Sequence, residues 1–237
     1  MKSHVPGIDD GERIARDVDL RRDCPKYMVY RDGEVVEEGK DVMAWWDEKE
    51  HVGFLIGCSF SFERALMEEG LTVTNIKHGR NVSMYKTTLP LCPSGVFQKC
   101  TYVVSMRPYR PDQIPHVRNV TRPFDLTHGE PIAWGWDAVR ELGIKDIAKP
   151  KYGDAPVCLD GSPFSSEETS NGEVPVFWGC GVTPQDAVRE SRIEGVVLGH
   201  LPGHMLVLDL KEEDVFETSK VEMEMDAGLR MNGILAI

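Results

Sequence analysis

The sequence has no apolar run long enough to cross a membrane, and its polar, acidic beginning lacks the apolar core of a signal peptide. It also lacks an excess of positive charge, because 27 Lys and Arg stand against 39 Asp and Glu, a net charge of -12. Most of such a surface repels nucleic acid and anionic membranes. We therefore expect a soluble protein that binds neither, located in the cytoplasm or, in a eukaryotic cell, alternatively in the mitochondrion.

Closely spaced cysteines are also missing. Six are scattered along the chain: Cys24, Cys58, Cys92, Cys100, Cys158 and Cys180. This pattern fits neither a zinc ribbon nor a small secreted disulfide scaffold, so we expect reduced thiols. His200 and His204 have the four-residue separation of two helical zinc ligands, but Pro202-Gly203 between them disfavours a helix. We therefore predict no metal site and no cofactor.

The most informative feature that the chain does contain is a motif that occurs twice. FLIGCSFSFERAL at Phe54 to Leu66 returns as VFWGCGVTPQDAV at Val176 to Val188. Each copy predicts a short strand, a Gly-Cys turn, a hydroxyl residue and a helix. If both strands lie in one sheet, two clusters of backbone N–H groups and two thiols meet at its carboxyl edge, where open α/β sheets bind ligands. The repeat therefore predicts a small-molecule site around Cys58 and Cys180.

Further elements follow from turn residues and from apolar patterns. Asp32-Gly33, between the β-prone halves of Tyr27 to Glu38, predicts a hairpin. Val42 to Lys49 predicts a short helix. Leu71 to Ile76 alternates like a strand and would complete a β-α-β unit, while two more β segments are expected near the end, at Val196 to Leu198 and Met205 to Leu208.

Helix boundaries are indicated by capping residues. Ser61 is expected to cap the first repeated helix, which Gly70 would end. Thr183 is expected to cap the second, with Pro184 in the first turn, where a missing N–H costs nothing. A further helix is predicted over Asp137 to Leu142, with Asp137 as its cap and Gly143 ending it.

The predicted fold class is α/β, with a mixed or mostly parallel sheet flanked by helices and a smaller inserted α+β subdomain. The insert is assigned to residues 81–136, which hold five prolines between Pro90 and Pro115, a β-rich stretch at Thr101 to Met106 and no long amphipathic helix. Residues 1–80 and 137–237 would then form the main domain.

Five blocks, in order along most of the chain, carry a resemblance to a known family. They are Gly57 to Glu63, Gly79 to Thr87, Val103 to Pro108, Val174 to Gln185 and Pro202 to Met205. Together they resemble the D-glutamate cyclase family of hydro-lyases. The resemblance implies a two-part α/β fold and a role in amino-acid metabolism, the cyclisation of D-glutamate to 5-oxo-D-proline with loss of water.

That reaction requires donors for an oxyanion, a cation for a carboxylate and an acid/base pair. Arg107 is the predicted carboxylate clamp, because a guanidinium binds both oxygens. The two helix N-termini would supply N–H donors, and Ser59, Ser61 and Thr183 would add hydroxyl groups.

Cys58, Cys180 and His204 are the predicted catalytic residues. A thiol beside a helix N-terminus can have a lowered pKa and act as a thiolate. The alternative is that both cysteines are small core residues. His204 is favoured by the resemblance. His128 is predicted to bind substrate, with simple turn chemistry as its alternative, and Glu63 is a further acid/base candidate.

Asn81, Tyr85 and Thr87 are the remaining predicted substrate-binding residues. On an extended strand, Tyr85 and Thr87 share one face while Lys86 points away. These side chains would offer amide, phenol and hydroxyl donors to the substrate. The alternative is an exposed polar strand.

Three functions remain open from the residues alone. The first is a hydro-lyase acting on a small amino-acid carboxylate. The second is a cofactor-independent racemase or epimerase, in which two thiols exchange the α-proton from opposite faces. The third is a non-catalytic binding protein for a small carboxylate. In each, the partner is a small-molecule carboxylate, and a homo-oligomer is compatible with the sequence.

Overall fold

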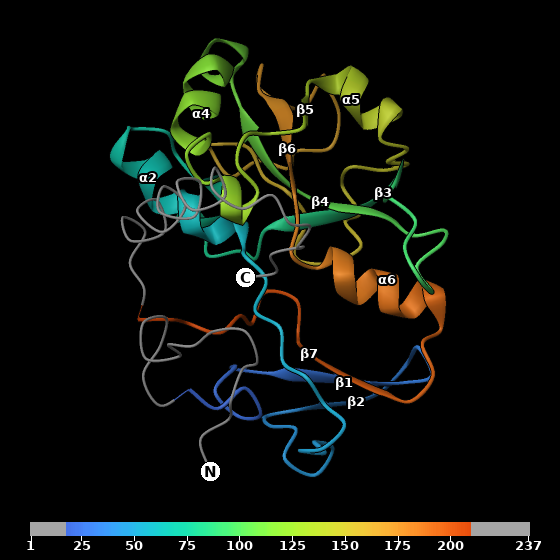
Figure 1. The fold of residues 1–237 in the computed structure, drawn as a ribbon. Coiled ribbons are helices and arrows are strands. Elements are labelled where there is room, and N and C mark those ends of the chain that lie inside the picture. Colours follow the sequence, from blue (N-terminus) through green and yellow to red (C-terminus); the bar gives the residue numbers. More distant parts are fainter. Residues whose placement is uncertain (1–17, 210–237) are drawn as a thin grey trace, which may run out of the picture. The chain divides into compact units, whose positions relative to one another are not determined.

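The computed structural model describes residues 18–209, and the chain divides into two compact units (Figure 1). The first unit holds the residues up to Gly57 and those from Arg192 onward, and the second holds Cys58–Ser191. These boundaries differ from the predicted insert at 81–136. The difference arises because that segment contains the central strand of the second unit, which cannot form a subdomain apart from its neighbours.

The first unit is built on a three-stranded antiparallel sheet of order β2-β1-β7. β1 (Tyr27–Arg31) and β2 (Glu34–Gly39) form the predicted hairpin. Asp32 and Gly33 have φ values of 53° and 80°, as the turn requires. β7 (Val196–His200) pairs with the other edge of β1, which confirms the first of the two predicted late β segments. The second, at 205–208, does not form a strand.

The helix predicted over 42–49 is replaced by turns. Val42 is buried against the hairpin, and its carbonyl accepts hydrogen bonds from the N–H groups of both Trp45 and Trp46. The Asp47 carboxylate accepts the N–H of Lys49 at 2.8 Å. This local side-chain bond competes with the helical pattern and ends it after one turn.

The second unit contains a four-stranded sheet of order β3-β4-β6-β5, in which every pairing is antiparallel. The strands are β3 (Ser83–Pro90), β4 (Thr101–Tyr109), β5 (Ala133–Trp134) and β6 (Val174–Gly179). Strands and helices are both present, so the α/β assignment stands in its mixed form. The expected mostly parallel sheet is wrong, because β3 and β4 are consecutive strands joined by a short connection, which favours antiparallel pairing.

Two predicted strands of the β-α-β unit do not form. Residues 52–57, ahead of the first Gly-Cys turn, pair with no strand, whereas their counterpart β6 lies between β4 and β5. The segment 71–76 instead enters a short helix, α3 (Thr74–Lys77), after the N–H of Leu71 bonds to the carbonyl of Leu66. An apolar pattern makes a strand only where a neighbour completes its hydrogen bonds.

Helices cover both faces of this sheet (Figure 1). On one face, α5 (Trp136–Glu141) packs against Tyr85, Val104 and Phe177. On the other, Phe62, from the helical segment after the first Gly-Cys turn, packs over Arg107 of β4, and the helix after the second turn also contacts β4. The remaining elements are η1 (Ser59–Phe62), α2 (Glu63–Glu68), η2 (Pro111–Gln113), α4 (Ile114–Thr121), η3 (Asp125–Thr127) and α6 (Thr183–Ser191). Within residues 18–209, no helix has the length and apolarity needed to cross a membrane.

The predicted helix ends are confirmed at Gly70 and Gly143, which have φ values of 74° and 71°. After α2, the bond from the N–H of Leu71 to the carbonyl of Leu66 spans Gly70 and closes a Schellman turn. The glycine supplies the left-handed conformation that this turn needs.

Gly153 holds the segment after α5 close to β3. Its φ is 76°, and a Cβ there would lie 1.9 Å from the carbonyl oxygen of Val82. We expect Gly153→Ala to lower the free energy of unfolding by about 3 kcal/mol or more, through clash and strain together. Gly172→Ala is the matched control, because Gly172 has a φ of 78° with open space around it, and we expect it to cost about 1 kcal/mol. Urea unfolding measures both, and equal effects would contradict the close packing.

Candidate functional site

The two Gly-Cys turns have the same local geometry. The carbonyl of Cys58 accepts the N–H of Ser61 at 3.1 Å, and the carbonyl of Cys180 accepts the N–H of Thr183 at 3.0 Å. A helical segment follows each turn, η1 and α2 after the first and α6 after the second. The repeat in the sequence is therefore a repeat in structure from the cysteine onward, although only the second copy begins with a strand.

The two turns lie side by side in the second unit. Phe60, in the first helical segment, packs against the apolar cluster that contains Cys180. The Ser59 hydroxyl lies 3.4 Å from that of Ser105, which pairs in register with Trp178 on β6. The first turn thus reaches the sheet beside the strand that leads into the second.

Both thiols have a raised pKa, contrary to the lowered pKa expected at a helix N-terminus. Burial is the main cause at Cys58, and it outweighs the opposing effects of the Phe60 N–H and the Arg107 charge. At Cys180, burial raises the pKa to about 12. Desolvation disfavours the charged form of a thiol, and here it exceeds the attraction of the neighbouring donors. Both cysteines therefore carry their protons at neutral pH.

This protonation state predicts slow alkylation. A raised pKa leaves less thiolate at any given pH, so we expect iodoacetamide to modify Cys58 more slowly than the exposed Cys92 near neutral pH. The Cys58 rate should still be rising at pH values above the ordinary thiol pKa of about 8.5, where the rate of an unperturbed thiol levels off. Peptide mass spectrometry after timed alkylation across a pH series measures both rates. Faster modification of Cys58 than of Cys92 near pH 7 would mean a thiolate and contradict the assignment.

A buried ion pair lies behind the first turn. The Glu63 Oε1 atom accepts hydrogen bonds from Arg107 Nη2 at 2.5 Å and Arg107 Nε at 2.8 Å. The same guanidinium donates to the hydroxyls of Ser59 and Ser105, each at 3.2 Å. We call Arg107, Glu63, Ser59 and Ser105 the Arg107 network.

The Arg107 network changes the role expected of its arginine. Arg107 is fully buried, and its guanidinium stacks over the rings of Phe62 and Trp178 at 5.2 and 5.4 Å. The carboxylate that it clamps is that of Glu63, so a substrate carboxylate has no open face of the guanidinium to bind. The network instead holds Ser59, whose hydroxyl also bonds to the Cys58 sulfur. Arg107 thus acts on Cys58 through Ser59.

His128 stands beside the second turn. A Cβ at Gly179 would lie 3.3 Å from His128 Nδ1, so the imidazole packs closely against the backbone of the second turn. His128 has a φ of 91°, a left-handed conformation that is uncommon outside glycine and often marks a functional residue. The hydroxyl of its neighbour Thr127 accepts a hydrogen bond from the hydroxyl of Ser61, in the first turn, at 2.6 Å. We call Cys58, Ser59, His128 and Cys180 the Gly-Cys site.

The hydroxyls of Ser61 and Thr183 have other partners than those predicted. Ser61 lies inside η1 rather than at a cap, and its hydroxyl donates to the carbonyl of Cys58 at 2.8 Å. Thr183 Oγ1 lies 3.1 Å from the N–H and 3.2 Å from the carbonyl of Val103. Both side chains brace the turns, and the structure does not present them to a ligand.

Tyr85 and Thr87 share one strand face, as predicted, but that face is buried. The Tyr85 hydroxyl donates to the carbonyl of Ile147 at 2.6 Å, and the Thr87 hydroxyl donates to that of Tyr102 at 2.8 Å. The register places them on the sheet face opposite Arg107. The structure therefore does not bring them to the Gly-Cys site, and their predicted binding role is replaced by one in the core.

His204 belongs to the first unit, and its role in a site of the second unit stays a prediction. It closes a turn through its N–H, which bonds to the carbonyl of Leu201 at 2.8 Å. Its Nδ1 lies 3.3 Å from the carbonyl of Pro202. In the part of the chain that the structure describes, no three His, Cys, Asp or Glu side chains are grouped to hold a metal ion.

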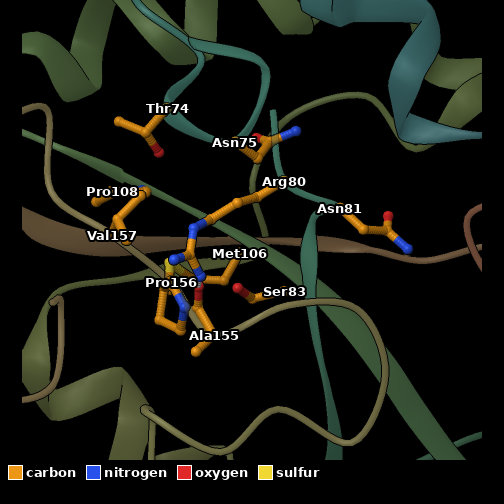
Figure 2. A pocket seen from close by; sticks show the side chains of 10 residues that line it. All are labelled: Thr74, Asn75, Arg80, Asn81, Ser83, Met106, Pro108, Ala155, Pro156 and Val157. Atoms are coloured by element: carbon orange, nitrogen blue, oxygen red, sulfur yellow. Dashed lines mark hydrogen bonds between the residues drawn. The ribbon is translucent and has the colours of Figure 1, made fainter. Parts of the chain in front are cut away.

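A small cavity of the second unit, lined by both polar and apolar side chains, was not anticipated from the sequence (Figure 2). Its volume is about 10 Å³. Asn81 lines it, as a predicted binding residue, but so do Asn75 and Arg80, which were not predicted as site residues although Arg80 lies in the Gly79 to Thr87 block. Asn75 Nδ2 reaches Glu63 Oε1 at 3.5 Å and so touches the Arg107 network. The other lining residues are Thr74, Ser83, Met106, Pro108, Ala155, Pro156 and Val157.

Comparison with known sequences identifies the family of this chain. The sequence model of the D-glutamate cyclase family matches residues 52–209, two thirds of the chain, including both Gly-Cys turns. The chain belongs to the D-glutamate cyclase family. This confirms the resemblance drawn from the five sequence blocks.

Several relatives in the D-glutamate cyclase family carry the name "Putative hydro-lyase". One from Bacillus subtilis (strain 168) is 44% identical over 90% of this chain and 75% of its own length. Another from Bacillus licheniformis is 44% identical over 89% of this chain and 72% of its own length. A third from Schizosaccharomyces pombe is 42% identical over 84% of this chain but 62% of its own length. The chain therefore spans about two thirds to three quarters of these relatives.

Proposed function

We propose that the chain is a hydro-lyase that cyclises D-glutamate to 5-oxo-D-proline at the Gly-Cys site. The α-nitrogen attacks the γ-carboxyl carbon, so that a C–N bond forms and a C–O bond breaks. The ammonium loses two protons, and both leave on the departing oxygen as water. The reaction is therefore balanced without an oxidant or a further reactant. Membership of the D-glutamate cyclase family supports this assignment.

The observation that carries the proposal is the protonated thiol of Cys58 at the end of the Arg107 network. Loss of water needs a proton donor for the leaving oxygen. Cys58 supplies that proton, and the resulting thiolate is stabilised by the Ser59 hydroxyl and by the nearby Arg107 charge. His128 takes one proton from the ammonium and returns it to the thiolate. The second proton passes from the attacking nitrogen to the departing oxygen, which leaves as water.

The same protonation state argues against the two-thiol racemase. That mechanism needs one of two facing thiols to act as a thiolate base. A pKa of about 12 at Cys180 leaves its thiolate too scarce for this role near neutral pH. Cys180 serves the site through packing, since it is buried in the apolar cluster with Val82, Met84 and Val103.

Turnover of the two glutamate enantiomers tests the proposal. The protein is incubated separately with D- and L-glutamate, and 5-oxoproline is followed by proton NMR against a sample without protein. We expect 5-oxo-D-proline to accumulate from D-glutamate faster than in the blank. Saturable binding of D-glutamate without any product would instead indicate the non-catalytic binding protein.

A further inference from the structure

A second, larger hollow of the second unit lies where η2 and α4 meet the edge strand β5 and the start of β6. Its volume is about 390 Å³, within the range of roughly 300–1,000 Å³ that small-molecule sites occupy. We call it the Arg118 groove. The side chains that line it are those of Pro111, Ile114, Pro115, Arg118, Trp134 and Val174.

The wall of the Arg118 groove is mainly aliphatic. Two prolines, an isoleucine and a valine contribute apolar side chains, and Trp134 is its single aromatic residue. The Arg118 guanidinium lies over the Trp134 ring, with its carbon 4.9 Å from the ring centroid. One face of the indole is therefore already covered by a cation and closed to ring stacking. Such a wall favours a flexible aliphatic chain over a flat aromatic ligand.

Arg118 also brings an available positive charge to the groove. Glu130 accepts hydrogen bonds from Arg118 Nε at 2.7 Å and from Arg122 Nε at 2.6 Å. Two guanidinium groups thus share one carboxylate, which leaves one positive charge on a chain whose net charge is -12. Within residues 18–209, the Nη1 and Nη2 atoms of Arg118 donate no hydrogen bond. Their N–H groups can bind both oxygens of a ligand carboxylate.

We propose that the Arg118 groove is a binding site for an aliphatic carboxylate of medium chain length. The carboxylate binds to Arg118, and the chain lies against Ile114, Val174 and the two prolines. A volume of about 390 Å³ equals roughly thirteen waters of about 30 Å³ each. A chain of about eight carbons therefore fits, since a methylene is about as large as a water. The groove shares no residue with the Gly-Cys site, so the proposal does not depend on the proposed function.

Three probes test the proposal on the full chain, below the concentration at which they form micelles. Binding is followed by chemical-shift changes of the Trp134 indole N–H. We expect saturable binding of octanoate. Butyrate should bind about tenfold more weakly or worse, because fewer methylenes leave water, and octylamine should do the same, because its ammonium meets a guanidinium. D-glutamate should not displace octanoate, since it lacks the aliphatic chain.

Variants separate this groove from the Gly-Cys site. Arg118→Gln should weaken octanoate binding by about tenfold or more. Arg122→Gln is the matched control, because it removes the same charge from the same carboxylate but does not line the groove, and it should leave binding within about twofold. Cys58→Ser should bind octanoate like the parent, even if it stops turnover.

The comparison of octanoate with octylamine on the parent protein keeps the charge test independent of any variant. No saturable shift with octanoate, equal binding of octylamine, equal binding by a folded Arg118→Gln variant, or displacement of octanoate by D-glutamate would each overturn the proposal.

Discussion

Replacing Cys58 by serine is expected to lower the rate of 5-oxo-D-proline formation by about 10²-fold to 10⁴-fold, the range for loss of a general acid. Serine keeps the size and the hydrogen bonds of the turn but is a far weaker acid than a thiol. Since Cys58 is only partly exposed and sits at the helical start, the fold should remain intact. Initial rates from NMR, with circular dichroism as the check on folding, measure the effect.

Cys180→Ser is the matched control, because the same substitution is made in the same turn of the repeat. We expect a rate within about tenfold of the parent, since Cys180 packs in the core and carries no proton in the mechanism. Equal loss from both substitutions, with both variants folded, would instead favour the two-thiol racemase and remove Cys58 from its special role.

Arg107→Leu is expected to lower the free energy of unfolding by about 3–5 kcal/mol, because it leaves the Glu63 carboxylate buried without its partner. The double variant Arg107→Leu with Glu63→Leu removes both charges and should recover part of that loss. Arg110→Leu is the control, since its pairing with Asp112 is exposed and should cost at most about 1 kcal/mol. Urea unfolding monitored by fluorescence gives all three values.

One result would contradict the ion-pair prediction. If Arg107→Leu is as stable as the double variant, Glu63 is not left as an unpaired buried charge in the single variant. In that case the Arg107 network would not be the rigid support for Ser59 and Cys58 that the mechanism uses.

Local features of the fold were predictable from the sequence. The Asp32-Gly33 hairpin and the helix ends at Gly70 and Gly143 depend on glycine or turn chemistry within a few residues. The repeated Gly-Cys turn is also a local feature. In each copy, the N–H of the residue three positions after the cysteine donates to the cysteine carbonyl. Each of these features depends on residues that are neighbours in the sequence, and the structure confirms them.

Features that depend on distant partners were not predictable. The apolar run at 52–57 resembles its copy in β6, yet only β6 has β4 and β5 beside it. The mixed or mostly parallel sheet was expected from strand–helix alternation, which does not determine which strands pair. A pattern of side chains defines a face, but the pairing partner decides whether a strand forms.

The same division applies to the candidate site. Arg107 was predicted to clamp a substrate carboxylate, but in the structure its guanidinium pairs with the carboxylate of Glu63. The thiols were expected to ionise from their place at helix starts, whereas burial reverses the direction of their pKa shift. Arg80 and Asn75 line the same cavity. Their proximity was not predicted, because the sequence pattern indicated a strand over 71–76, where the structure has Asn75 on the short helix α3.

The most direct test of the central claim is a time course of D-glutamate in deuterated water with the parent protein, Cys58→Ser and Cys180→Ser. NMR reports 5-oxoproline, the inverted enantiomer after chiral derivatisation, and deuterium at the α-carbon in one series. We predict 5-oxo-D-proline from the parent and Cys180→Ser, almost none from Cys58→Ser, and no α-deuterium in any sample. Deuterium at the α-carbon that requires both thiols, or no product from a folded parent protein, would contradict the account.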